Sequence, residues 1–223
     1  HGKYGEFSYT HTDDELYVNL FVASQLNWKE KKFVIKQETN FPSEETVRLT
    51  IDSRKAQTLK IKIRCPWWVK PGEMKVICKG KDYAVGTQPS SYIEIERRWK
   101  KGDVIEVTMP MTITVEELPN LPNYIAIMRG PILMGARMGD YRLDGLVAND
   151  GRWAHIAHGP LVSLFDTPFL IGERDEIVEK LQGMQPVSGK PMHFTVPGLF
   201  EKKYADLELE PFSQIHDSRY MMY

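Results

Sequence analysis

Carboxylic acids are the commonest side chains in this sequence that could do chemistry, but their positions argue against a catalytic pair. Hydrolysis by two carboxyl groups requires them to flank one bond at a fixed separation, one protonated and one ionised. Glu94 and Glu96 alternate with apolar residues, so they point to one solvated face. Other acids fall in predicted turns or at strand ends, namely Asp13, Asp14, Glu15, Glu44, Glu45, Glu116 and Glu117. Solvation therefore explains these acids better than catalysis does.

Histidines could hold a metal ion if His155 and His158 lay on one face of a helix. Gly159 and Pro160 follow directly and disfavour a helix, and in a strand the two imidazoles would point to opposite sides. The more distant candidate ligands are Asp150, Asp166, His193 and His216. We expect surface or hydrogen-bonded histidines and no metal.

Neither of the two cysteines, Cys65 and Cys78, has a second cysteine or histidine at the short spacing of a zinc site. Pro66 and Gly72 supply a turn between the strand-like runs that carry them, so the thiols could face each other. Two buried free thiols are favoured over a disulfide, because a lone pair is no disulfide framework. Nucleophile-elbow and phosphate-loop motifs are also missing, so we predict no catalytic residue and no cofactor in this chain.

Tryptophans give the strongest binding signal. Trp67 and Trp68 are adjacent, and their flat faces could stack on sugar rings as a carbohydrate platform. Packing is the favoured alternative, in which Trp99 caps a hydrophobic interior and Trp67 or Trp68 is buried against a neighbouring sheet or another domain. The remaining tryptophans are Trp28 and Trp153.

The elements that would position these residues are mostly strands. Several segments alternate apolar and polar side chains, the period of a strand with one buried face. They are residues 33–37, 47–51, 59–64, 92–96 and 104–109, with a denser apolar run at 16–23. Turn signals separate them, so the fold class is mainly β: an antiparallel β-sandwich of immunoglobulin or jelly-roll type.

A second β-rich unit should follow the sandwich. The segment Leu118 to Asn123, with two prolines and two asparagines, is the best candidate for a boundary or crossover. Beyond it, short strands are predicted at 124–128, 132–135, 192–196, 206–210 and 218–223, with one short amphipathic helix at 173–182. We therefore divide the chain into 1–12, a remnant of an upstream helical domain, 13–117, the β-sandwich, and 118–223, a second β-rich region with a C-terminal extension.

Composition excludes several classes of protein. The 223 residues are 42% hydrophobic and 26% charged, with a formal net charge of -1, as in ordinary globular domains. This balance argues against a nucleic-acid partner. No stretch approaches the roughly 20 apolar residues that span a bilayer, so we expect no membrane partner.

Several strings in the first 137 residues together resemble glycoside hydrolase family 127, the β-L-arabinofuranosidase-like proteins, in the β-sandwich portion towards the C-terminus. They occur in the family's order: LYVNLFVASQLNW at 16–28, QETNFP at 37–42, IRCPWW at 63–68, RRWKKGDVIEVTMPM at 97–111 and IAIMRGPILMG at 125–135. Residues 143–223 resemble an extension of some Bacteroidetes members. Cys65, where the family usually has an aliphatic residue, and the Cys78-Lys79-Gly80 turn depart from the pattern.

The resemblance implies a parent in which an (α/α) barrel carries the active site and the β domains pack against it. Catalysis in such parents uses a cysteine nucleophile held with other cysteines and a glutamate at a zinc ion. Those cysteines would precede His1, so zinc belongs to the upstream domain and neither Cys65 nor Cys78 inherits a role. The resemblance also implies a periplasmic or secreted protein.

We therefore expect a non-catalytic accessory portion of a glycoside hydrolase acting on L-arabinofuranosides or related plant glycans. Its expected partners are the upstream helical catalytic domain of the same chain and a plant polysaccharide or oligosaccharide. Two alternatives remain open: a carbohydrate-binding module that uses its surface tryptophans, and an immunoglobulin-like interaction domain.

Overall fold

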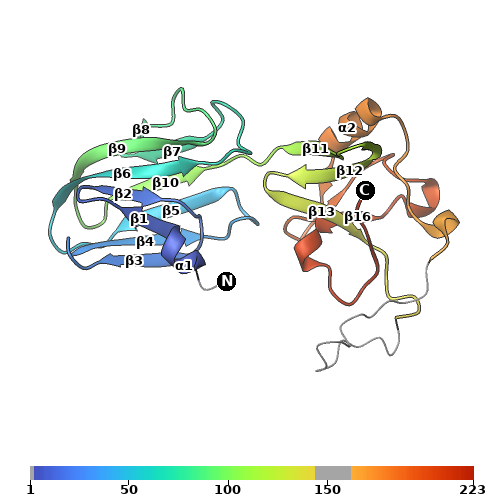
Figure 1. The fold of residues 1–223 in the computed structure, drawn as a ribbon, viewed down its shortest axis with the longest axis horizontal. Coiled ribbons are helices and arrows are strands. Elements are labelled where there is room, and N and C mark those ends of the chain that lie inside the picture. Colours follow the sequence, from blue (N-terminus) through green and yellow to red (C-terminus); the bar gives the residue numbers. More distant parts are fainter. Residues whose placement is uncertain (1–2, 144–161) are drawn as a thin grey trace. The chain divides into compact units, whose positions relative to one another are not determined.

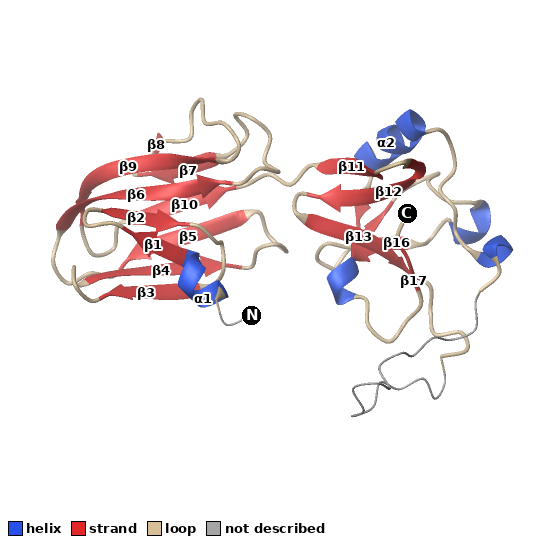
Figure 2. Cartoon of the chain, in the orientation of Figure 1, coloured by secondary structure: helices blue, strands red, loops and turns tan. Residues whose placement is uncertain are grey.

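The computed structural model describes residues 3–143 and 162–223, and the chain divides into two compact units, His1–Thr112 and Ile113–Tyr223 (Figure 1). Strands dominate both units and helices are few (Figure 2), which confirms the mainly β fold class. Asp150, Trp153, His155 and His158, which the sequence analysis considered, lie outside the described residues. Among the described residues, no helix has the length and apolar character needed to cross a bilayer.

The first unit, unit 1, is a sandwich of two sheets. One sheet has the order β1-β2-β6-β9 and the other β3-β4-β5-β10-β7-β8. The strands of the first sheet are β1 (Tyr9–His11), β2 (Glu15–Val18), β6 (Gln57–Cys65) and β9 (Ser91–Trp99). Those of the second are β3 (Ser24–Trp28), β4 (Phe33–Thr39), β5 (Thr46–Ile51), β10 (Val104–Thr108), β7 (Lys75–Cys78) and β8 (Lys81–Asp82).

Alternation along β6 and β9 places one face of each strand in the core, as predicted. Ile61 pairs with Ile95 and Ile63 with Ile93, and all four side chains are essentially inaccessible to solvent. Burying each such side chain is worth roughly 1.5–3 kcal/mol. The intervening lysines and glutamates point outward, which explains why basic residues interrupt a core strand.

Two features of this sheet were not predicted. The pair β2 and β6 is parallel, because the chain leaves β2 for the other sheet and returns to this one only at β6. The second feature is the start of the chain. The five-residue helix α1 (Tyr4–Ser8) leads into β1, and because β1 pairs with β2, residues 4–11 belong to unit 1. The dense apolar run at 16–23 contains β2 and then a loop, residues 19–23, before β3 begins.

The second unit, unit 2, is built on one sheet with the order β11-β12-β13-β16-β15-β14, and β17 also pairs with β13. The strands are β11 (Ile113–Leu118), β12 (Leu121–Arg129), β13 (Ile132–Arg137), β14 (Gln185–Pro186), β15 (Phe194–Thr195), β16 (Glu208–Pro211) and β17 (Tyr220–Met221). The helices are α2 (Arg174–Gln182) and the short 3-10 turns η1 (Leu164–Asp166), η2 (Lys202–Tyr204) and η3 (Phe212–Gln214). The helix predicted at 173–182 matches α2, whose first turn is closed by a capping box between Glu173 and Glu176.

The proline- and asparagine-rich segment 118–123 is a hairpin turn within unit 2. Leu118 and Leu121 pair across this turn, and Asn120 has a left-handed backbone with φ 64°. Asparagine tolerates this conformation, so the same residues that signal a boundary also suit a tight turn. The boundary between the units instead falls between Thr112 and Ile113, where β11 begins.

Trp99 closes one end of the core of unit 1, as predicted. Its side chain is fully buried, and its indole N–H donates to the carbonyl oxygen of Leu59 at 3.0 Å. A Trp99→Phe variant loses this hydrogen bond and leaves a void, so we expect it to lower the free energy of unfolding of unit 1 by about 1–3 kcal/mol. Urea unfolding followed by tryptophan fluorescence measures this loss.

The matched control for this prediction is Trp67→Phe, at an exposed tryptophan of the same unit. We expect it to change the free energy of unfolding by no more than about 0.5 kcal/mol. Equal effects of the two substitutions would contradict the structural role assigned to Trp99.

Candidate functional site

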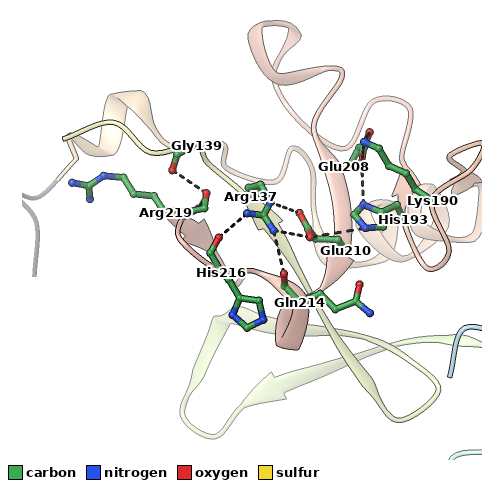
Figure 3. A network of polar contacts seen from close by, with 10 residues as sticks. Arg137, Gly139, Lys190, His193, Glu208, Glu210, Gln214, His216 and Arg219 are labelled. Carbon is green, nitrogen blue, oxygen red and sulfur yellow. Dashed lines mark hydrogen bonds and ion pairs between the residues drawn. The ribbon is translucent and has the colours of Figure 1, made fainter. Parts of the chain in front are cut away.

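The most extensive group of charged side chains in unit 2 is centred on Arg137, at the end of β13 (Figure 3). Its guanidinium forms a bidentate ion pair with the Glu210 carboxylate, with Nε 3.0 Å from Oε1 and Nη2 3.3 Å from Oε2. Its remaining N–H groups donate to the carbonyl oxygens of His216 at 2.9 Å and Gln214 at 3.2 Å. Arg137 therefore fixes the segment after β16 to the C-terminal end of β13.

A second carboxylate, Glu208, completes the group, which we call the Arg137 network: Arg137, Lys190, His193, Glu208 and Glu210. The ammonium group of Lys190 donates to both carboxylate oxygens of Glu208, at 2.9 and 3.0 Å. The His193 imidazole lies between the two acids, with Nδ1 3.1 Å from Glu208 and Nε2 4.0 Å from Glu210. These residues line a polar groove of about 450 Å³.

Charge compensation decides what the Arg137 network can do chemically. The bond to Glu210 raises the pKa of Arg137, and the hydrogen bond from Lys190 lowers the pKa of Glu208. An acid catalyst at neutral pH needs the opposite shift, a carboxyl group that keeps its proton. The network therefore suits a structural role, in which buried Glu210 is neutralised by a bidentate arginine.

Sequence reasoning could not find this network. The sequence suggests His193 and His216 only as distant candidate metal ligands, and it carries no local signal for Arg137 or Glu210. The alternation of Glu208 and Glu210 with leucines suggests a solvated acidic face, yet Glu210 is only 4% exposed. Its burial depends on a partner 73 residues away, which no local pattern reveals.

A similar ion lattice covers the outer face of unit 1. Glu15 and Glu94 share Lys60 and Lys62, with the four nitrogen–oxygen distances between 3.0 and 3.6 Å. The hydrogen bond from the Tyr17 hydroxyl is the main cause that lowers the pKa of Glu15, and that from Lys62 lowers the pKa of Glu94. Both carboxylates are held ionised, which supports the prediction that these acids are solvating rather than catalytic.

The two predicted site tryptophans differ in environment. Trp67 is 57% exposed, whereas Trp68 is half-buried and stacks on Phe41, with ring centroids 5.9 Å apart. Their loop, residues 66–74, lies at the same end of the sandwich as loop 83–90, because Cys65 pairs with Ser91. Val85 of that second loop is also exposed, so this end of the sandwich presents at least two large apolar side chains to solvent.

The cysteines are free and buried, as expected. Cys65 lies in β6 and Cys78 in β7, in different sheets, and burial raises the pKa of the Cys65 thiol. Over residues 3–143 and 162–223, no three His, Cys, Asp or Glu side chains come together in a way that could hold a metal ion. These residues do not fit the zinc centre that the family resemblance implies.

The pKa of Glu208 gives a pH-dependent prediction. Because its pKa is lowered on folding, Glu208 contributes stability above the ordinary glutamate pKa of about 4.3, and this is lost as the pH falls through the folded-state value. We expect Glu208→Gln to lower the free energy of unfolding by about 1 kcal/mol near pH 7 and by less near pH 3. Urea unfolding of unit 2 at both pH values tests this.

Asp206→Asn is the control, because Asp206 is an exposed acid at the same groove. It should leave the free energy of unfolding within about 0.5 kcal/mol of the parent at both pH values. A Glu208→Gln effect that grows as the pH falls would refute the assigned direction.

Comparison with known proteins relates this geometry to a family. Residues 15–111 match the model described as the β-L-arabinofuranosidase GH127 middle domain, and residues 114–223 match DUF4986, a domain of unknown function. No curated protein matches.

Solved structures give the same relationship. A GH127 β-L-arabinofuranosidase from Geobacillus stearothermophilus T6 is 28% identical over 60% of this chain, with a TM-score of 0.51. The GH127 β-arabinofuranosidase BT3674 is 29% identical over 58%, with a TM-score of 0.50. This chain covers only 22% and 23% of those two proteins.

A third structure, described as a glycoside hydrolase, extends the likeness to both units. It matches 96% of this chain with a TM-score of 0.57, and this chain covers 36% of it. At 20% identity, it shows similarity of fold alone. The family model places the relationship in unit 1: residues 15–111 form a β-sandwich related to the middle domain of glycoside hydrolase family 127, the β-L-arabinofuranosidases, and the two GH127 structures share the fold over 58–60% of this chain.

Proposed function

We propose that this chain is a non-catalytic accessory portion of a glycoside hydrolase that acts on L-arabinofuranosides or related plant glycans. The observation that carries the proposal is the match of residues 15–111 to a GH127 middle domain. The surface tryptophans and the sandwich fold also suit the two alternatives, a carbohydrate-binding module and an interaction domain, but no relative favours either.

The chemistry of the described residues supports an accessory role. Retaining and inverting hydrolysis both need carboxyl groups free to exchange a proton or attack a sugar. The pKa values of Glu15, Glu94 and Glu208 are lowered by hydrogen bonds from lysines or a tyrosine, so none of these three suits the role of the protonated acid in such a pair. The buried thiol of Cys65, whose pKa burial raises, is a poor nucleophile.

The proposed partner is a helical (α/α) barrel in the same polypeptide, which would carry the active site and its zinc ion. Two large apolar side chains of unit 1, Trp67 and Val85, are exposed to solvent. Exposed apolar side chains of this kind support packing of unit 1 against the barrel. Burial against another domain would remove their apolar surface from water. We further propose a periplasmic or secreted location and a C-terminal extension of the Bacteroidetes type.

The catalytic part of the proposal is tested by turnover. The purified 223-residue chain should hydrolyse p-nitrophenyl β-L-arabinofuranoside no faster than buffer, with or without added zinc. The same chain joined to its helical barrel should be active and lose that activity with a chelator. Hydrolysis of this substrate by the 223-residue chain alone (the short chain), without added zinc, would overturn the accessory role.

The interface part is tested at Trp67. Because its side chain is exposed here, Trp67→Ala should change the free energy of unfolding of the short chain by no more than about 0.5 kcal/mol. In the protein that contains the barrel, the same substitution should lower the midpoint of thermal unfolding by several degrees, measured by calorimetry. The same small effect in both proteins would contradict burial of Trp67 by a partner domain.

A further inference from the structure

A second groove, separate from the Arg137 network, opens in unit 2 and has no role in the accessory function. Its walls are the β11–β12 hairpin, the segment before α2, the first turns of α2, and the last residues of the chain. Its volume of about 660 Å³ falls within the range of small-ligand sites, roughly 300–1,000 Å³. We call it the α2 groove.

Exposed aromatic rings line the α2 groove. Tyr124, from β12, is 57% exposed, and Phe169, from the segment before α2, is 48% exposed. The side chains of Ile125 and Ile177 are buried in the same lining. A folded unit normally removes aromatic surface from water, so two exposed rings at one groove are characteristic of binding sites.

The hydroxyl of Tyr223, in the same lining, is buried without a hydrogen-bond partner, among the residues the structure describes. Burial also raises its pKa, so the phenol stays protonated and able to donate. A buried hydroxyl without a partner costs free energy, so this end of the groove lining is not fully satisfied by the chain itself.

The polar groups at the groove favour a ligand without charge. Glu117 and Arg174 form an ion pair across the lining, so their charges offset each other while their remaining lone pairs and N–H groups stay in solvent. The N-terminus of α2 is closed by Glu173 and Glu176, whose carboxylates repel anions. Asn123 adds an exposed amide.

We propose that the α2 groove binds a neutral oligosaccharide. The rings of Tyr124 and Phe169 stack on the C–H faces of sugar units, and Glu117, Arg174 and Asn123 exchange hydrogen bonds with sugar hydroxyls. An extended peptide is disfavoured, because α2 packs beside β11, the edge strand to which a peptide would add. The inference rests on the proposed function only for the choice of an arabinose-containing probe.

The test is titration calorimetry of the 223-residue chain with two neutral probes, arabinohexaose and cellohexaose. We expect at least one to bind, and Tyr124→Ala and Phe169→Ala each to weaken its Kd by about tenfold or more, which corresponds to about 1.4 kcal/mol. Circular dichroism verifies that each variant is folded, which the exposure of both side chains favours.

Two controls make the outcome specific. Phe165→Ala removes an 89% exposed phenylalanine of the same unit that is not part of the α2 groove, and Trp67→Ala removes the exposed tryptophan of unit 1. Both should bind as the parent does. Loss of binding in either control alone, binding unaffected by both groove variants, or no heat with either probe at millimolar concentration overturns the proposal.

The result is independent of the accessory function. Absence of turnover by the short chain tests catalysis, whereas the calorimetry measures binding without turnover.

Discussion

Unit 1 depends on one constraint: each of its long strands must bury one side between two sheets. Leu59, Ile61 and Ile63 in β6 share the inner face of their sheet with Ile93 and Ile95 in β9, and these side chains are nearly or fully buried. Because the strand period is two, every other residue is forced to the outer face. Most polar side chains of these strands therefore lie on that face, with Gln37 and Arg97 as exceptions at inner positions of β4 and β9.

Charge compensation on those outer faces limits what the chain can catalyse. Lys60 and Lys62 each contact both Glu15 and Glu94, which keeps the carboxylates ionised and their geometry shared. In unit 2, Arg137 pairs with Glu210 and Lys190 pairs with Glu208. Paired charges of this kind stabilise a surface modestly.

The sequence predicts the two-sheet core well because alternation is local: β4, β5, β6, β9 and β10 all fall on predicted segments. It also predicts the packing of Trp99 and the free thiols of Cys65 and Cys78. It does not predict the parallel pair of β2 and β6, the turn at Asn120, or the bond between Arg137 and Glu210. These depend on residues that meet only after folding, and turn residues carry the same signal at a hairpin as at a boundary.

Several strands of unit 2 are very short, and side-chain hydrogen bonds take over part of their role. Strands β14, β15 and β17 have two residues each, so they supply few ladder hydrogen bonds, and side chains must fix the irregular segments between them. Arg137, in β13, pairs with Glu210 of β16. It also donates hydrogen bonds to the carbonyl oxygens of Gln214 and His216, in the segment after β16. Short strands fixed by polar bonds cannot close every edge with apolar packing. The α2 groove lies beside the β11–β12 hairpin and α2, where the rings of Tyr124 and Phe169 stay exposed.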